Sequence, residues 1–368
     1  MSTKAGQLQS SMDSAILRIL DAGEYVLGSE VFRLERALTE FTGARHCITC
    51  GSGTDALLLA LMALGVGPGD VVFVPGFTFV ASAESAALLG AIPFFVDVLP
   101  GTFNMDPESL RCSIANAKQL GLKARAVIVV DLFGQPADYA TIRRISDADN
   151  LVVISDFCQS MGATFFGRKT GVLGDMSVTS FFPTKPLACY GDGGAVFTDN
   201  CDWARLIESM RDHGREGRRH EHVRIGINSR LDTVQAAVLL QKLVIFPEEL
   251  IAREETAARY TRRLAAHITI PTVIDGARPS WSLYTIRVDN RDAVVYQLAK
   301  KKIPTVVCYP RPVNRQHGYS RFPATAGGLP VCESLSGRVL SLPVHPYMSE
   351  RRQNDIIDTL LEIVADKS

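Results

Sequence analysis

The sequence predicts an α/β protein, with a large, mostly parallel sheet flanked by helices and a smaller C-terminal α+β domain. Short apolar runs alternate with helix-length amphipathic segments through the first two thirds of the chain. These runs lack the polar alternation of half-exposed strands, so both faces of each expected strand are covered. After about residue 245 the pattern changes to charged helices and scattered short strands. We therefore place the domains at residues 1–245 and 246–368, and 46% apolar residues suffice for two cores.

The expected elements follow in chain order. The strands of the large sheet are expected at 46–49, 71–74, 92–96, 126–130, 151–154, 176–181 and 194–198. In the smaller domain we expect a helix over 248–267, a strand pair near 268–272 and 283–288, a helix ending at 302 and a terminal helix after 349. Polar residues follow several strands of the large sheet, where sheets of this type bind ligands.

The bulk composition limits the partners. Lys plus Arg and Asp plus Glu both number 39, so no net charge attracts the protein to nucleic acid or to an anionic membrane. No apolar run approaches the roughly 20 residues of a membrane span. The first residues lack a secretory signal, and the eight scattered cysteines suit a reducing compartment. We expect a cytoplasmic protein whose partners are small molecules and like subunits, with no metal at Cys47 and Cys50.

A lysine and a carboxylate give the strongest chemical signal. Lys185 lies in the turn Ser180-Phe-Phe-Pro-Thr-Lys-Pro-Leu, and Asp156 ends the apolar strand 151–154. A lysine amine can form a Schiff base with pyridoxal 5'-phosphate (PLP), and a carboxylate can keep the pyridine nitrogen of this cofactor protonated. The pair indicates amino-group chemistry.

A turn with two glycines, 51–55, follows the first strand and opens an apolar helix. The free N–H groups and the positive end of the helix dipole suit a phosphate, and Thr54 adds a hydroxyl. Simple helix capping by residues 52–55 is the alternative. The turn matches neither a Walker loop nor a dinucleotide fingerprint, which argues against a dehydrogenase.

Two aromatic segments and a basic loop complete the candidates. Phe79 can stack on a flat heterocycle or pack in the core, whereas Phe77 is expected in the core. Phe157 and Cys158 are expected to pack beneath the ring, and no nearby base activates the thiol. The polar segment 213–224 is a solvated loop or an anion-binding loop for a nucleotide diphosphate.

Several motifs in order resemble the DegT/DnrJ/EryC1/StrS family of fold-type I, PLP-dependent nucleotide-sugar aminotransferases. The matching segments are 22–28, 52–57, Asp156 with Gln159, 180–185, 191–194 and 226–230. The residue sequences of four segments are similar to those of the subgroup that acts on UDP-2-acetamido-2-deoxy-3-oxo-D-glucuronate: 180–187, 190–195, 228–237 and 341–347.

The resemblance implies roles for individual residues. Lys185 carries the cofactor, Asp156 pairs with the pyridine nitrogen, Phe79 stacks on the ring and Gln159 contacts the ring hydroxyl. The phosphate is held by Gly53, Thr54, Asp55 and Ser180, and by Asn228 from the second subunit of a homodimer with shared sites. Arg230 and Tyr309 lie near the sugar.

The implied activity is transfer of an amino group from L-glutamate, giving 2-oxoglutarate, to a keto UDP-sugar on the route to surface polysaccharides such as the O-antigen of lipopolysaccharide. Another UDP- or dTDP-linked 3- or 4-keto sugar, or a non-catalytic PLP-binding regulator, stays as an alternative. A sugar dehydratase of this family is disfavoured because it carries histidine in place of Lys185. The chain departs from the family pattern at Phe157 and Cys158, and at Cys308, where the uronate subgroup tends to have histidine.

Overall fold

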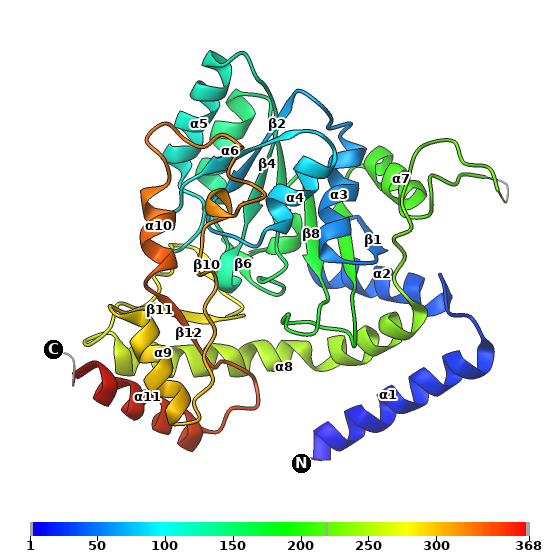
Figure 1. Ribbon diagram of the computed structural model, residues 1–368. Coiled ribbons are helices and arrows are strands. Elements are labelled where there is room, and N and C mark those ends of the chain that lie inside the picture. The colour runs from blue at the N-terminus through cyan, green and yellow to red at the C-terminus, as the bar shows by residue number, and fades with distance from the viewer. Residues whose placement is uncertain (1–2, 218–219, 366–368) are drawn as a thin grey trace.

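The computed structural model describes residues 3–217 and 220–365. Its centre is a seven-stranded sheet in the order β1-β9-β8-β5-β4-β2-β3, with helices on both faces (Figure 1). The strands are β1 (His46–Cys50), β2 (Asp70–Pro75), β3 (Ile92–Val96), β4 (Lys123–Val130), β5 (Val152–Asp156), β8 (Met176–Ser180) and β9 (Gly194–Thr198). All the strands expected in the large sheet are confirmed.

The sheet is parallel except at β9, which is antiparallel to both β8 and β1. The pairs β2–β3, β2–β4, β4–β5 and β5–β8 are all parallel. The carboxyl ends of β1, β2, β4, β5 and β8 therefore meet at one edge. Polar residues that follow these strands in sequence are thereby gathered in space.

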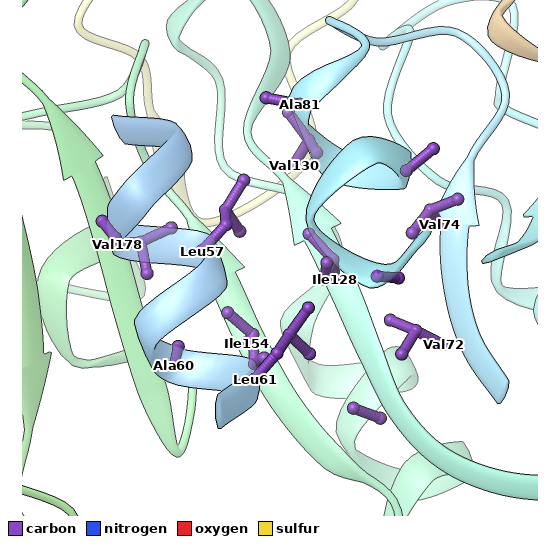
Figure 2. Packing of buried hydrophobic residues seen from close by; sticks show 14 of the residues in the cluster. Leu57, Ala60, Leu61, Val72, Val74, Ala81, Ile128, Val130, Ile154 and Val178 are labelled. Atoms are coloured by element: carbon purple, nitrogen blue, oxygen red, sulfur yellow. The ribbon is translucent and has the colours of Figure 1, made fainter. Parts of the chain in front are cut away.

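Both faces of the sheet are buried, which explains the unbroken apolar runs. Val72 and Val74 pack under α3 (Gly53–Ala63), α4 (Ala81–Leu88) and α7 (Cys201–Met210), as Figure 2 shows for α3 and α4. Val71 and Phe73 point to the opposite face, because successive side chains of a strand alternate. That face is covered by α5 (Pro107–Gln119), α6 (Tyr139–Ala148), α2 (Ser29–Thr42) and part of α8 (Thr233–Leu264).

A separate apolar core supports the C-terminal unit. It joins the end of α8 to β11 (Tyr284–Arg287), α9 (Arg291–Lys300), β12 (Val339–Leu342) and α11 (Glu350–Ala365). The boundary we expected after residue 245 lies inside α8, which continues through Pro247. One helix thus connects the two cores, and Figure 1 shows it running beneath the sheet from one unit to the other.

The strand expected over 268–272 is not formed. Only Thr269 bridges to Arg287, and β11 instead pairs with the distant β12. Pro271 lacks an N–H and cannot continue a ladder, which accounts for the single bridge.

The remaining elements lie around this frame. Helix α1 (Thr3–Ala22) packs along α8. Leu329, together with Cys332 and Leu335 of α10 (Pro330–Ser336), packs in the core of the large domain. A small sheet contains β6 (Thr164–Phe165), β7 (Arg168–Lys169) and β10 (Ala277–Arg278). Short 3₁₀ helices cover Leu132–Gly134, Thr170–Val172 and Val313–Arg315.

Candidate active site

Asp156 ends β5 at the edge where the parallel strands finish, and only 7% of its surface is exposed. Its Oδ1 accepts the Cys158 N–H at 3.1 Å, and within the described residues it has no ion pair. Burial raises the pKa of Asp156, while the hydrogen bonds from Cys158 and the charge of Lys185 act in the opposite direction. A buried carboxylate without a bonded cation is suited to a cationic ligand such as a protonated pyridine nitrogen.

Lys185 lies in the loop that joins β8 to β9. Its backbone N–H donates to the Phe182 carbonyl at 2.9 Å, and its side chain is partly buried. The charge of Lys185 also lowers the pKa of the Cys158 and Cys308 thiols, although burial outweighs it and leaves both raised. The same charge acts on Asp156, so Lys185 and Asp156 lie close enough to interact electrostatically.

The turn before α3 forms a cup of free N–H groups. Ser52 caps the helix by accepting the Asp55 N–H at 3.0 Å. In the described part of the chain, the N–H groups of Gly53 and Thr54 have no acceptor. Capping and anion binding are thus compatible here, because the cap uses the Asp55 N–H and leaves the first two donors to a ligand.

Close packing explains one glycine of this cup, Gly53, and one in the neighbouring strand β9, Gly194. A Cβ added to Gly53 would lie 2.7 Å from the Ser180 Cβ, so the cup and the end of β8 are in contact. A Cβ on Gly194 would lie 2.3 Å from the Ser52 carbonyl oxygen. Gly194 pairs with both Cys50 and Ser180, which places the carboxyl ends of β1 and β8 on either side of it.

Gln159, Tyr309 and Phe79 lie on the same side of the sheet edge. Gln159 Oε1 accepts the Phe133 N–H at 2.8 Å, and its Nε2 lies 3.5 Å from the Tyr309 hydroxyl. Phe79 is 55% exposed, and its ring centroid is 6.4 Å from that of Tyr309. Phe77 is buried in the core, as expected.

Three residues that depart from the family pattern have distinct surroundings. Phe157 is fully buried and packs on Phe197 in the core between the sheet and α2. Its side chain belongs to this core and not, as expected, to the space beneath the cofactor ring. Cys158 lies against Gly53, and its raised pKa makes it a poor nucleophile. Cys308 is half-buried and close enough to Lys185 to feel its charge.

Asn228 and Arg230 contact Asp212 rather than the residues described above. Asn228 is exposed and forms a bridge with Asp212, and Arg230 pairs with the Asp212 carboxylate at 2.7 Å. Among the described residues of the basic loop, Arg215 pairs with Asp212 and Arg224 with Glu216. Arg218 and Arg219 lie outside the described residues.

Sequence reasoning missed several supporting residues. The Ser229 hydroxyl accepts the Gly51 N–H at 2.9 Å and donates to the Asp55 carboxylate at 2.8 Å. Asp131, which follows β4, is buried beside Asp156. The helix cap itself was anticipated at residues 52–55, but no local pattern points to Ser229 or Asp131.

Comparison with known proteins decides the family. The model of the DegT/DnrJ/EryC1/StrS aminotransferase family matches residues 7–361. The chain belongs to this family. It is 44% identical to UDP-2-acetamido-2-deoxy-3-oxo-D-glucuronate aminotransferase of Pseudomonas aeruginosa, over 95% of this chain and 94% of that protein.

Solved structures agree with this assignment. A DegT DnrJ EryC1 StrS aminotransferase from Brucella abortus has a TM-score of 0.96 and 44% identity, covering 99% of this chain and 98% of that one. NtdA from Bacillus subtilis, solved with bound cofactor PMP, has a TM-score of 0.88 and 27% identity, covering 98% of this chain and 82% of that one.

The protein is therefore a PLP-dependent aminotransferase of fold type I, which confirms the predicted fold, enzyme class and cofactor. The free N–H groups at Gly53 and Thr54 and the unpaired Asp156 carboxylate fit such a cofactor. In the described residues, no helix of this aminotransferase combines the length and apolarity needed to cross a membrane.

Proposed function

We propose that this aminotransferase moves the amino group of L-glutamate to C-3 of UDP-2-acetamido-2-deoxy-3-oxo-D-glucuronate, in the biosynthesis of a surface polysaccharide such as lipopolysaccharide O-antigen. The chemistry is supported by one observation above others: the buried Asp156 feels the charge of Lys185 at the sheet edge beside the cup of free N–H groups. The choice of sugar is supported by the 44% identical relative of that name, which aligns over nearly the whole chain.

The chain's own residues would act as follows. When bound, PLP supplies an aldehyde that takes up the amino group and a ring that accepts electrons. Lys185 would hold that aldehyde between turnovers. After its release, Nζ would take the proton from the α-carbon of the donor in the first half-reaction and return one to C-3 of the sugar in the second. Asp156 would keep the ring nitrogen protonated.

The surrounding residues would orient the cofactor. Gly53 and Thr54 would donate N–H groups to the phosphate, and the Ser180 hydroxyl lies beside them. Gln159 would donate Nε2 to the ring hydroxyl, because its Oε1 is already used by Phe133. Asp55 would contribute through the helix end that it helps to order, since its own N–H is bonded to Ser52. Phe79 would stack on the ring.

We further propose a cytoplasmic homodimer whose two sites are shared. Asn228 is exposed in its own chain, which leaves its side chain available to a partner subunit, and the family resemblance assigns it to the phosphate there. Arg230 and Tyr309 would line the sugar side of the site. Cys308, which is half-buried near Lys185, leaves the sugar carboxylate to be held by another residue, and Arg230 is the candidate.

The decisive experiment separates the chemistry from the substrate. Glutamate added to the purified PLP-loaded protein is expected to convert the cofactor to its pyridoxamine form. The conversion is followed as the loss of the visible absorption band of the lysine-bound PLP. Lys185→Ala should abolish turnover, and Asp156→Asn should still bind PLP but lose most of its turnover. Undiminished glutamate-dependent transamination by Lys185→Ala would falsify the assigned role.

A panel of nucleotide sugars then tests the acceptor. We expect the UDP-linked 3-oxo uronate to outperform UDP- and dTDP-linked 3- and 4-keto sugars that lack the carboxylate. Preference for a dTDP-linked or 4-keto sugar would support another nucleotide-sugar aminotransferase instead. A protein that binds PLP but gives no half-reaction with any amino donor would support the regulatory alternative, which the intact Lys185 and Asp156 disfavour.

A further inference from the structure

Asp131 directly follows β4, and its carboxylate is completely buried. Oδ1 accepts the Ala137 N–H at 3.0 Å and the Tyr139 hydroxyl at 2.9 Å, and Oδ2 accepts the Ser160 hydroxyl at 2.7 Å. No ion pair accompanies these bonds within the described residues. Burying a carboxylate that is hydrogen-bonded only to neutral donors costs folding free energy. Its presence here therefore calls for a functional explanation.

The bonds of Asp131 converge on both ends of the segment that carries Asp156 and Gln159. Ser160 follows Gln159 and is bonded directly. Ser155 precedes Asp156, and its Oγ lies 2.6 Å from the Tyr139 hydroxyl, which itself donates to Asp131. The Asp131 N–H also donates to the Asp156 carbonyl at 3.0 Å.

A second link runs through the turn that follows Asp131. The Phe133 N–H, two residues on, binds Gln159 Oε1 and so selects which end of that amide faces Tyr309. The Asp131 carboxylate closes this turn by accepting the Ala137 N–H. The position of Asp131 therefore affects both the backbone of Asp156 and the side chain of Gln159.

We propose that Asp131 is a positioning residue of the cofactor site: its buried carboxylate ties Ser160, Tyr139 and the 131–137 turn together, and thereby holds Asp156 and Gln159 in place for the pyridine ring. This role rests on the proposed cofactor contacts of Asp156 and Gln159. Among the described residues, the Asp131 carboxylate bonds to Ala137, Tyr139 and Ser160 and not to Lys185, so it acts through these neighbours. Its network is supported by the pKa of Asp131, which burial raises and the Ser160, Ala137 and Tyr139 hydrogen bonds lower.

The test makes the same substitution, aspartate to asparagine, at two buried positions. Asp131→Asn keeps the size of the side chain but replaces one acceptor oxygen with an NH₂ group. Asp97→Asn is the matched control, because Asp97 is also buried after a parallel strand and accepts two N–H groups, those of Val331 and Cys332 at 3.0 and 2.9 Å. Both donors lie in the first turn of α10, and neither belongs to the 155–160 segment.

Three quantities are measured for each purified variant: the melting temperature of the cofactor-free protein, the dissociation constant for added PLP, and the rate of the half-reaction with glutamate. Both variants are expected to melt earlier than the wild type. Only Asp131→Asn is expected to weaken PLP binding and slow the half-reaction, by about tenfold or more, which is the size of effect seen when residues that orient metal ligands are removed. The near-ultraviolet and visible dichroism of the bound PLP should change in this variant alone.

The outcomes separate this inference from the proposed function. If Asp131→Asn lowers the melting temperature as Asp97→Asn does, yet binds PLP and reacts within twofold of the wild type, the positioning role is wrong. If the wild type itself does not bind PLP, the proposed function is wrong. Should Asp131→Asn not fold, two other variants test the network: Tyr139→Phe removes the hydroxyl that joins Asp131 to Ser155, and Ser160→Ala removes the bond from Ser160 to Asp131. Unchanged PLP affinity in both would overturn the inference.

Discussion

Phe133 donates its backbone N–H to Oε1 of Gln159 at 2.8 Å, and this bond orients the amide so that Nε2 is the end near Tyr309. The side-chain amide can therefore donate, but not accept, toward the space beside Asp156. A neutral donor at that position would stabilise an ionised ring oxygen of the cofactor, as proposed for Gln159. The preference comes from a backbone group on another loop, which is why no local pattern around Gln159 reveals it.

Gln159→Glu tests this orientation. The carboxylate can still accept the Phe133 N–H, but it presents an oxygen where Nε2 was. We expect weaker PLP binding and a shifted absorption maximum, with a loss on the order of 1–3 kcal/mol for a polar group left without a partner. Gln159→Asn, which is too short to reach, is the comparison. Equal PLP affinity in the wild type and Gln159→Glu would exclude a donor role.

Gly53→Ala should damage the phosphate cup. The new Cβ would lie 2.7 Å from the Ser180 Cβ, closer than carbon atoms approach without a shift. We expect a PLP dissociation constant raised by at least tenfold, or about 1.4 kcal/mol. Gly67→Ala is the control, because nothing lies within 4 Å of its added Cβ. Adding Ser180→Gly to Gly53→Ala should restore part of the packing, although the Ser180 hydroxyl is lost.

The stability of the protein should depend on the pH through Asp131. Burial raises the pKa of Asp131 to about 7 in the folded state, from an ordinary value near 3.8. The folded protein therefore binds this proton more tightly than the unfolded chain, so the stabilisation is full at low pH and is lost as the pH rises through about 7. The groups facing Asp131 are Tyr139, Ser160 and, nearby, Asp156.

The measurement is the melting temperature of the cofactor-free wild type minus that of Asp131→Asn, taken from pH 5 to pH 8. This difference should decrease as the pH rises, because the variant has no such proton to lose. A difference that stays constant or increases over this interval contradicts the raised pKa. Using the difference removes the contributions of the other titrating groups, which both proteins share.

Mixing two inactive variants tests the shared sites. Lys185→Ala lacks the amine, and Asn228→Ala lacks the group proposed to reach across the dimer. In a mixed dimer one site combines Lys185 of one chain with Asn228 of the other, so an equal mixture should recover about a quarter of the wild-type activity. Variants of residues within one chain's site, Lys185→Ala and Asp156→Asn, should not complement each other. Absence of recovery in the first mixture would show that each site uses its own Asn228.

Much of the fold was predictable from local pattern. Strands covered on both faces are continuously apolar, so runs such as 126–130 and 194–198 identified the large sheet directly. Local pattern was a weaker guide to the domain boundary after residue 245 and to the strand over 268–272. A helix that leaves one core and enters another keeps a helical pattern throughout, as α8 does, and Pro271 prevents an apolar segment from becoming a strand.

The sequence by itself determined the chemistry of the centre, because a lysine in its turn, a strand-ending Asp156 and a glycine-bearing helix start are local features with few alternative uses. Only the tertiary structure decided how that centre is supported. Asp131, Phe133 and Ser229 lie far from their partners along the chain and meet them only at the common edge of the sheet. Hydrogen bonds between such residues depend on how the strands are ordered, and strand order is set by the packing of the whole chain rather than by any one segment.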